Sequence, residues 1–332
     1  MTICVYGAGS IGCYVGGRLA AAGADVVFVG RERLRAQVAA HGLTLTDWRG
    51  ASMRVPSVRY ETGAAAAADA DLVLVTVKSA ATESAGDELA PLLKPDATVV
   101  SFQNGLHNAE LLASRLPGRT VLPGMVGFNV VQRGEGVFHA GSEGELEVAR
   151  HPALASHAAV FEAAGLPLTQ HADMASVLWG KLLLNLNNPV NALSGLPLQE
   201  ELSQRAYRRC LGLAQAETLR LLAVAGIRPA KLTPLPPSWL PALLGLPDAV
   251  FTRVAGRMLA IDPLARSSMW EDLEAGRTTE VDYLNGEVVA LASRLGREAP
   301  VNARLVALIR SAESGGRRDW SGPDLYAALT SR

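Results

Sequence analysis

Apolar and polar positions in the first thirty residues follow an order that predicts two strands joined through a turn and a helix. An apolar run at residues 3–6 leads into the turn Gly7-Ala8-Gly9-Ser10-Ile11-Gly12, a small-residue segment follows to residue 22, and a second apolar run occupies residues 26–29. The order strand, glycine turn, helix and strand is the context in which a dinucleotide-binding motif is found. The sequence therefore predicts a bound dinucleotide.

Each glycine of this turn has a separate expected role. Gly7 permits the tight turn after the strand, Gly9 lets backbone N–H groups approach a pyrophosphate, and Gly12 lets the helix pack closely on the sheet. The pyrophosphate is expected at the helix N-terminus, where unpaired N–H groups and the helix dipole favour anions. The cofactor-binding residues predicted in the turn are Gly7, Ala8, Gly9, Ser10, Ile11 and Gly12.

The end of the second apolar run indicates which dinucleotide is bound. Proteins that bind NAD usually have Asp or Glu there, to bind the ribose hydroxyls. This chain has Val29-Gly30-Arg31 at that point, and Glu32 comes only after it. A guanidinium pairs with a phosphate in a planar, charge-assisted way, so Arg31, with two further arginines behind it, favours the 2′-phosphate of NADPH/NADP+. The alternative is that these arginines form the exposed start of a helix.

The next segments add a hairpin and a short helix. Residues 43–46 and 53–58 alternate between apolar and polar positions around residues 47–50, which predicts a hairpin with Pro56 at a sheet edge. The alanine tract at residues 64–68 predicts a short helix.

Two continuous apolar runs, at residues 72–77 and 98–102, predict buried parallel strands. The first run ends at Lys78 and the second at Gln103-Asn104-Gly105. In open α/β sheets, ligands bind beyond the carboxyl ends of the strands, so Lys78 and Asn104 are expected to face the same crevice as the glycine turn. The alternatives are an exposed loop lysine and a turn-forming Asn-Gly pair.

Apolar runs at residues 120–122, 127–131 and 145–148 are expected to continue the sheet, and the glycine-rich residues 132–144 are expected to form turns. From about residue 172 helical patterns replace the strand-like runs.

The predicted fold class is therefore α/β, with a Rossmann-type NADP-binding domain over residues 1–172. An all-α domain follows over residues 173–332, in which the candidate catalytic residues and most of the candidate substrate-binding residues lie. Within the second domain, the proline-rich residues 229–247 are expected to form a surface loop or short helices.

Composition agrees with two domains, since 332 residues exceed what one core usually supports. Hydrophobic residues make up 49% and the formal net charge is −1 with no basic block, so no nucleic acid or anionic membrane is expected as a partner. Cys4, Cys13 and Cys210 lack metal-ligand spacing, and they are expected to pack as small apolar side chains in a reducing compartment. Met1 leads directly into the first strand and no apolar run is long enough to span a bilayer, so a cytoplasmic protein is expected.

The helix predicted after residue 172 carries a polar face. At about 100° per residue, Lys181, Asn185 and Asn188 fall within a sector of about 60°, away from the leucines of the same helix. Buried polar groups need partners, so this face must meet water, a ligand or a polar network. A lysine placed there is a candidate general acid for a carbonyl oxygen during hydride transfer. The alternative is a surface lysine beside asparagines that cap or bridge helices.

Two further features accompany this face. Pro189 lacks an N–H group and crowds the carbonyl of Asn185, which predicts a kink there. Downstream, Gly276 is expected to end one helix, and Thr278 or Thr279 to cap the next, which places Glu280 in a first helical turn. Spacing leaves two interpretations open for Glu280 and Ser268: substrate contacts, or a dipole-stabilising carboxylate and a surface hydroxyl.

Taken together, these motifs resemble the ketopantoate reductases (2-dehydropantoate 2-reductases), and the resemblance covers nearly the whole chain. It implies a Rossmann domain followed by a helical domain of the 6-phosphogluconate dehydrogenase C-terminal type, and the transfer of hydride from NADPH to a 2-oxo acid. The resemblance rests on the glycine turn, Val75-Thr76-Val77-Lys78, Gln103-Asn104-Gly105, Leu178-Trp179-Gly180-Lys181-Leu182 with Asn185, Ser267-Ser268-Met269, and residues 279–286.

The resemblance also implies individual roles. Lys181 matches the general acid of the family, and Glu280 matches a glutamate that contacts substrate and supports catalysis. Ser268 matches the serine that holds the substrate carboxylate, and Asn185 matches a substrate-side asparagine. Asn104 matches an asparagine beside both nicotinamide and substrate, while Arg31 and Lys78 match contacts to the nucleotide. Asn188 is assigned to the substrate side, although the matching Asn-Pro follows the lysine one position later in the family.

These comparisons leave three functions open. The first is the reduction of ketopantoate to pantoate in pantothenate and coenzyme A biosynthesis. The second is the reduction of another branched 2-oxo acid, because Leu198 stands where many members have an asparagine and Asn188 is shifted. The third is an NADP-binding sensor without turnover, since a fold alone does not establish chemistry. A homodimer through an exposed apolar helix within residues 202–225 is a further expectation.

Overall fold

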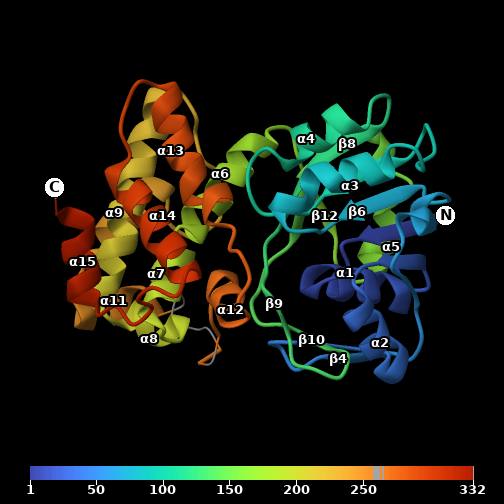
Figure 1. Cartoon of the computed structure of the whole chain (residues 1–332), viewed down its shortest axis with the longest axis horizontal. Coiled ribbons are helices and arrows are strands. Elements are labelled where there is room, and N and C mark those ends of the chain that lie inside the picture. The colour runs from blue at the N-terminus through green and yellow to red at the C-terminus, as the bar shows by residue number, and fades with distance from the viewer. Residues whose placement is uncertain (257–261, 264, 332) are drawn as a thin grey trace. The chain divides into compact units, whose positions relative to one another are not determined.

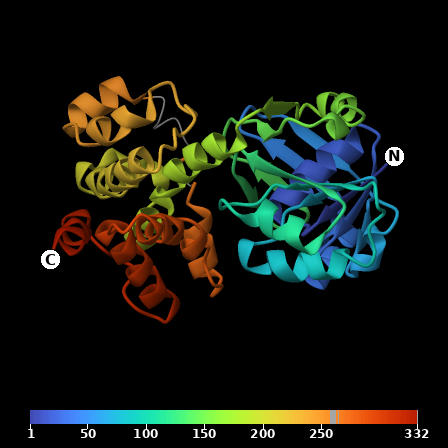
Figure 2. The same cartoon turned by 90° about the horizontal axis from the view of Figure 1, so that it is seen from above.

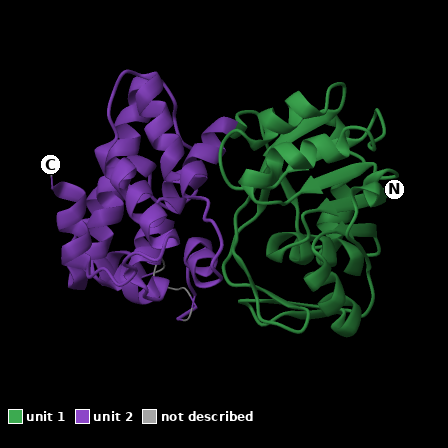
Figure 3. Ribbon diagram, in the orientation of Figure 1, with its two compact units in different colours: residues 1–174 green, residues 175–332 purple. Residues whose placement is uncertain are grey.

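The computed structural model describes residues 1–256, 262–263 and 265–331. They form two compact units, residues 1–174 and 175–332, shown in different colours in Figure 3. The predicted domain boundary near residue 172 lies two residues from this division. Which unit binds which ligand stays a prediction.

The first unit is built on an eight-stranded sheet of order β12-β11-β8-β7-β6-β1-β2-β5. The six strands from β5 to β8 in this order are parallel, and they repeat the 3-2-1-4-5-6 order of a doubly wound nucleotide-binding fold. Strands β11 and β12 extend it, with β11 antiparallel to β8. The strands are β1 (Thr2–Tyr6), β2 (Asp25–Val29), β5 (Arg59–Glu61), β6 (Leu72–Val75), β7 (Thr98–Ser101), β8 (Thr120–Val126), β11 (Leu146–Ala149) and β12 (Leu168–His171).

Both faces of this sheet are covered, which explains why the middle positions of its central strands are apolar on both faces. On β1, Val5 packs into one core with α1, while Cys4 packs into the other with α3 and α4. Figure 1 shows these helices on either side of the strands. The helical elements of the first unit are α1 (Ser10–Ala21), α2 (Glu32–His41), η1 (Ala64–Ala67), η2 (Ser79–Ala81), α3 (Thr82–Leu89), α4 (Asn108–Arg115), η3 (Pro152–Leu154) and α5 (Ala158–Ala163).

A second sheet, of order β4-β3-β10-β9, packs against α1. The predicted hairpin is confirmed as antiparallel β3 and β4, and β4 lies at the sheet edge with Pro56 directly after it. Two predictions are wrong: residues 127–131 contribute to this sheet instead of the main one, and residues 132–144 contain a strand. The reason is that β10 pairs in parallel with the distant β3, while positive φ angles at Gly134 and Gly136 form the turn before it. The strands are β3 (Leu43–Asp47), β4 (Ser52–Val55), β9 (Val130–Gln132) and β10 (Val137–Ala140).

The described residues of the second unit contain helices and no strand, as predicted, and Figure 2 shows them from above. The kink predicted at Pro189 is found as a break at Leu186, between α6 and α7. Among the described residues, no helix is long and apolar enough to cross a membrane. The elements are α6 (Met174–Asn185), α7 (Asn187–Ser194), α8 (Leu198–Ser203), α9 (Arg205–Val224), η4 (Pro237–Trp239), α10 (Leu240–Leu244), α11 (Asp248–Val254), α12 (Ser268–Glu274), η6 (Val281–Tyr283), α13 (Asn285–Arg294), α14 (Pro300–Glu313) and α15 (Gly322–Thr330).

Helix α9 is central to this unit, where it packs against α8, α10, α14 and α15. The expectation of an exposed apolar helix within residues 202–225 is therefore wrong, because most of these apolar side chains are used inside the unit. The proline-rich residues 229–247 form η4, α10 and an extended segment, as expected. That segment lies against α6, since the N–H of Ala230 donates to the carbonyl of Ser176 at 2.7 Å.

Candidate active site

The glycine turn has the geometry that its three glycines predict. Gly7 has a φ of 98°, and a Cβ there would lie 2.5 Å from the backbone nitrogen of Val77. A Cβ on Gly12 would lie 2.6 Å from the hydroxyl oxygen of Thr76, so α1 approaches the sheet as closely as only glycine allows. By contrast, a Cβ on Gly9 would have the carbonyl oxygen of Gly7, 3.8 Å away, as its nearest neighbour. The space beside Gly9 is open on the side where a pyrophosphate is expected.

The N-terminus of α1 is suited to an anion. Gly9 precedes the helix, no side chain caps it, and its first turn contains no acidic residue. The first backbone N–H groups of a helix have no partner within the helix, and the helix dipole places partial positive charge there. Together with the open space beside Gly9, this end of α1 fits the pyrophosphate of a dinucleotide.

Tyr60, which our sequence analysis missed, supports the same turn. Its hydroxyl donates a hydrogen bond of 2.8 Å to the carbonyl oxygen of Ala8, and its ring stacks on that of Phe28. Burial raises the pKa of the phenol, so it remains a hydrogen-bond donor. A Cβ on Gly30 would collide with the hydroxyl of Tyr60. Tyr60 is the central residue of the short strand β5, and it lies opposite Phe28 because β5 pairs with β2. The sequence alone does not show this pairing, so it gave no sign that Tyr60 lies near the glycine turn.

The residue after Gly30 at the end of β2 is an arginine, and the exposed Glu61 ends the neighbouring strand β5 beside Val29. Arg31 precedes α2 and is exposed, and its guanidinium has no hydrogen-bonding partner among the residues that the structure describes. Glu32 accepts two hydrogen bonds of 2.8 Å from Arg35, which lower the pKa of its carboxyl. The nearest acidic side chain after β2 is therefore engaged by an arginine, while Arg31 is available for an anionic ligand.

The loops that carry Lys78 and Asn104 follow β6 and β7, which continue the sheet from β1. Because these strands are parallel, both loops and the glycine turn lie at the same edge of the sheet. The Ser79 hydroxyl donates to the carbonyl of Asn104 at 2.7 Å. The Gln103 amide donates to the carbonyl of Val77 at 3.1 Å. The structure therefore brings the two predicted loops together within the first unit.

The glycine turn is joined to this network through Thr76. Its hydroxyl donates to the carbonyl of Gly7 at 2.8 Å, and its backbone N–H donates to the carbonyl of Tyr6 at the same distance. Three adjacent loops at one sheet edge are thus held by side-chain hydrogen bonds, as a preorganised binding site requires.

In the second unit, Lys181 and Asn185 lie one turn apart on α6, and both are partly exposed. Leu182 and Leu183 on the same helix are buried. Asn188 lies beyond the break, on α7, so the sector calculated for one straight helix applies to Lys181 and Asn185 but not to Asn188.

Ser268 is the exposed first residue of α12, and the preceding Ser267 is the residue that caps this helix. The Ser267 hydroxyl accepts from the N–H of Trp270 at 3.2 Å and donates to the carbonyl of Asn188 at 3.3 Å. The side-chain oxygen of Asn191 accepts from the N–H of Ser267 at 2.9 Å. Two predicted residues from distant parts of the sequence, Asn188 and Ser268, are thus held next to one bridging serine.

The expected placement of Glu280 in a first helical turn is wrong. Gly276 ends α12 with a positive φ of 62°, as predicted, but residues 277–280 are not helical. Glu280 is buried and immediately precedes the short 3₁₀ turn η6. The N–H of Thr279 donates to Glu313 on α14 at 2.7 Å, and the Thr279 hydroxyl accepts from the N–H of Val281 at 3.3 Å, so residue 279 is held just before η6.

Comparison with known proteins assigns the chain to a family. The model of the family "Ketopantoate reductase PanE/ApbA" matches residues 3–153, and its C-terminal model matches residues 173–313. A 2-dehydropantoate 2-reductase of Halobacterium salinarum is 31% identical over 323 residues, which cover 95% of this chain and 100% of that protein.

Solved structures agree with this assignment. A PanE/ApbA family ketopantoate reductase from Ralstonia eutropha JMP134 is 30% identical, has a TM-score of 0.80, and the match covers 95% of this chain and 99% of that one. A D-mandelate dehydrogenase solved with NADH and anilino(oxo)acetate has a TM-score of 0.79, with the same coverage of both chains, but is 19% identical and shares the fold alone. The chain belongs to the ketopantoate reductase PanE/ApbA family and is an oxidoreductase.

Proposed function

We propose that this chain reduces ketopantoate (2-dehydropantoate) to pantoate with NADPH, in pantothenate and coenzyme A biosynthesis. The observation that carries the proposal is that both units match the family, over residues 3–153 and 173–313. A protein that had kept only nucleotide binding would need only the first unit, so this match favours a reductase over a sensor.

The residues of the first unit would hold the dinucleotide. The backbone N–H groups of Ser10, Ile11 and Gly12 begin α1 and would bind the pyrophosphate, with the open side of Gly9 leaving room for it. Lys78 and Asn104 follow the neighbouring strands and would bind further along the same cofactor. When bound, the nicotinamide supplies a hydride to the 2-oxo carbon of the substrate.

The residues of the second unit would complete the reaction. As the carbonyl oxygen gains negative charge, the Lys181 ammonium donates its proton to that oxygen, and the C=O group becomes an alcohol. Asn185, one turn along α6, would hold the ammonium or the substrate in place. Ser268 and Asn188 would bind the substrate carboxylate and its neighbouring oxygens, and the Glu280 carboxylate would contact the substrate and support catalysis.

The preference for NADPH over NADH rests on Arg31. Its exposed guanidinium has no hydrogen-bonding partner in the described structure, whereas Glu32 is engaged by Arg35. An arginine recognises a phosphate monoester well and a ribose diol poorly, which favours the 2′-phosphate of NADPH.

Steady-state oxidation of NADPH, measured with ketopantoate and a panel of other branched 2-oxo acids, tests the proposal. We expect ketopantoate to have the highest kcat/KM. In Lys181→Ala, kcat should fall by roughly 10²–10⁴, which is the usual contribution of a general acid, while NADPH still binds. Lys94→Ala is the control. Lys94 pairs with Asp71 just before β6, at the amino ends of the parallel strands, whereas the cofactor is expected at their carboxyl ends. Unchanged turnover in Lys181→Ala would exclude the general-acid role.

The panel also tests a second substrate. Leu198 is the partly buried first residue of α8, where many family members have an asparagine, so a more apolar 2-oxo acid is the alternative substrate. A higher kcat/KM for such an acid would keep the mechanism and replace the substrate. Tight NADPH binding with no turnover on any acid would instead support the sensor. The homodimer and the cytoplasmic location stay predictions, which sedimentation and cell fractionation test.

A further inference from the structure

A buried carboxyl group lies among three helices of the second unit and is not used by the mechanism above. Glu201 on α8 has an exposed fraction of 0%. Its Oε2 accepts hydrogen bonds from the side-chain amides of Asn187, at 2.9 Å, and Asn191, at 3.3 Å, both on α7. Among the described residues, Glu201 Oε1 and Asn187 Oδ1 are buried side-chain oxygens that lack a hydrogen-bond partner.

These two unpaired oxygens belong to groups that are already joined by a hydrogen bond. An ionised carboxylate offers only acceptors, so it leaves both oxygens without a donor and places an uncompensated charge in the core. A single proton on Oε1 gives that atom a donor and gives Asn187 Oδ1 a partner. The carboxylic acid and the amide would then be joined by two antiparallel hydrogen bonds, the observed one to Oε2 and a second from Oε1 to Asn187 Oδ1.

The electrostatic surroundings of Glu201 favour the proton. Burial raises the pKa of the carboxyl to about 8, and the hydrogen bonds from Asn187 and Asn191 lower it only in part. Helix α9 packs against α8 and carries three buried ionisable groups close to it in sequence: Tyr207, Arg208 and Cys210. Burial raises the pKa values of Tyr207 and Cys210, the latter to about 12, and both groups become anions when they lose a proton, so neither adds a positive charge. The guanidinium of Arg208 donates to backbone carbonyls and pairs with Asp248 at 2.9 Å instead of with Glu201.

We propose that Glu201 is a neutral carboxylic acid at pH 7 that pairs with the amide of Asn187, and that this pair positions Asn188 and Ser268 for the substrate. The first half concerns the protein alone. The second half rests on the proposed function, in which those two residues bind the substrate.

The positioning works through Asn191. Its amide nitrogen donates both to Glu201 and to the carbonyl of Leu196, at 3.0 Å, which fixes the amide so that its oxygen accepts from the N–H of Ser267. Ser267 then holds the carbonyl of Asn188 and the start of α12, where Ser268 is the first residue. Glu201 touches neither substrate nor cofactor in this scheme, so it is a positioning residue.

Stability tests the first half. Glutamine has the shape and hydrogen-bonding pattern of a protonated glutamate, so Glu201→Gln is expected to fold. Because the folded pKa of about 8 lies above the ordinary value of 4.5, the native state binds the proton, and the stability that it contributes is present below pH 4.5 and lost as pH rises to 8. The melting temperature of Glu201→Gln minus that of wild type should therefore rise over this range and then stay constant. A difference that does not depend on pH would overturn the proposal.

Infrared spectroscopy gives a measurement that needs no variant. Wild-type protein with 13C-labelled glutamate should show a protonated-carboxyl C=O band at pH 7, which disappears with a midpoint near pH 8. Glu201→Gln should lack this band. A wild-type spectrum without it, as expected if a buried water donated to an ionised Glu201, would overturn the proposal even if the variant failed to fold.

Kinetics test the second half. If only the neutral form of Glu201 positions Asn188 and Ser268, the wild-type KM for ketopantoate should rise roughly tenfold from pH 7 to pH 9. The KM for NADPH should not show this rise. In Glu201→Gln the additional rise should be absent. Equal pH profiles of KM in the two proteins, with the infrared band present, would confine Glu201 to a structural role. Absence of wild-type turnover with every acid would instead contradict the proposed function and leave the infrared result intact.

Discussion

The Tyr60 hydroxyl donates a hydrogen bond of 2.8 Å to the carbonyl oxygen of Ala8, which joins the edge strand β5 to the glycine turn after β1. The backbone N–H groups of Gly7 and Ala8 both donate to the carbonyl of Val29, so the turn is also held by β2. The peptide units that would face a pyrophosphate are thus fixed from two neighbouring strands before any ligand binds.

Tyr60→Phe removes this bond and leaves the carbonyl of Ala8 without that donor. We expect a loss of about 1 kcal/mol in the free energy of unfolding, measured by urea denaturation, and a severalfold higher dissociation constant for NADPH. Tyr207→Phe is the matched control, because its hydroxyl also donates to a backbone carbonyl, that of Trp320, at 2.8 Å, in the second unit. It should lose similar stability and bind NADPH as wild type does. Equal affinities in both variants would contradict the supporting role of Tyr60.

Gly9 and Gly12 should respond to alanine in opposite ways. A Cβ on Gly12 would lie 2.6 Å from Thr76 and 2.9 Å from Val5, so Gly12→Ala should cost about 1–3 kcal/mol of stability through overpacking. A Cβ on Gly9 meets no atom closer than 3.8 Å, so Gly9→Ala should melt near the wild-type temperature but bind NADPH at least roughly tenfold more weakly. Gly63→Ala, at a glycine with open space around it, is the control for both measurements. Wild-type NADPH affinity in Gly9→Ala would exclude a pyrophosphate beside it.

Arg31→Ala should lower the preference for NADPH. Losing a charge-assisted contact at an exposed site should raise the KM for NADPH about tenfold and leave the KM for NADH nearly unchanged. Arg33→Ala removes a neighbouring exposed arginine from α2 and should leave both constants near wild type. If the ratio of the two KM values in Arg31→Ala stayed as in wild type, the 2′-phosphate would have to be bound elsewhere.

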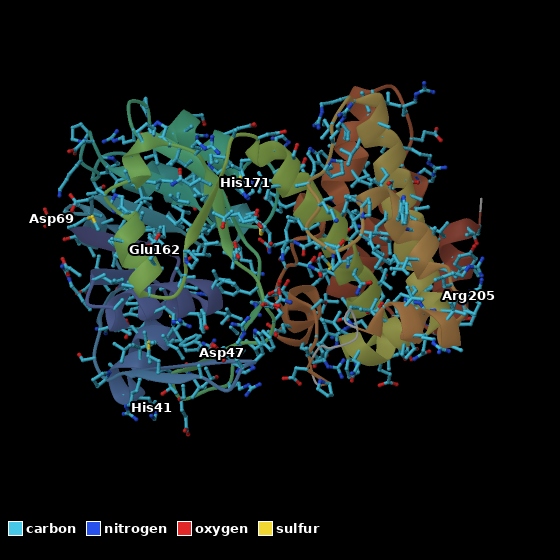
Figure 4. All side chains as sticks on the ribbon, turned by 180° about the vertical axis from the view of Figure 1, so that it is seen from behind. His41, Asp47, Asp69, Glu162, His171 and Arg205 are labelled. Atoms are coloured by element: carbon cyan, nitrogen blue, oxygen red, sulfur yellow. The ribbon has the colours of Figure 1, made fainter. Side chains whose placement is uncertain are left out.

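Arg208 should be essential for the stability of the second unit. It is fully buried on α9, and its guanidinium donates to four backbone carbonyls, those of residues 202, 203, 244 and 246. Arg208→Met should reduce the free energy of unfolding by roughly 3 kcal/mol, since several buried acceptors lose their donors together. Arg205, exposed at the start of the same helix (Figure 4), donates to one carbonyl, and Arg205→Ala should change stability by about 0.5 kcal/mol or less. Similar losses of unfolding free energy in Arg208→Met and Arg205→Ala would contradict the special role of Arg208 in stability.

The strands around the glycine turn could be predicted from the sequence because each is a continuous apolar run that is buried on both faces. Val73 and Leu74, for example, point to opposite faces and enter different cores, so both positions must be apolar. Strands β9 and β10 could not be predicted in the same way. They are short, glycines separate them, and β10 depends on pairing with β3, which no local pattern shows.

Local signals also misplaced Glu280. The Thr279 hydroxyl accepts from the N–H of Val281, as a capping residue would, but the element that follows is the short 3₁₀ turn η6, which begins after Glu280. Glu201 was missed for a related reason. Nothing in its immediate sequence marks it as buried. The one available signal was that Asn187 and Asn191 lie four residues apart, and so on one face of a helix, where two amides need polar partners. A side chain whose partners lie on other elements is visible only after the fold is known.

The pairing of Thr44 on β3 with Val137 on β10 also determines how the first unit can form during synthesis. A nascent chain that has emerged as far as β8 already contains the glycine turn, yet β3 still has an open edge beside its hairpin partner. Unpaired strand edges template association between chains. A truncated fragment ending before Val130 would therefore make a poor minimal nucleotide-binding module, even though it would contain every parallel strand of the main sheet from β5 to β8.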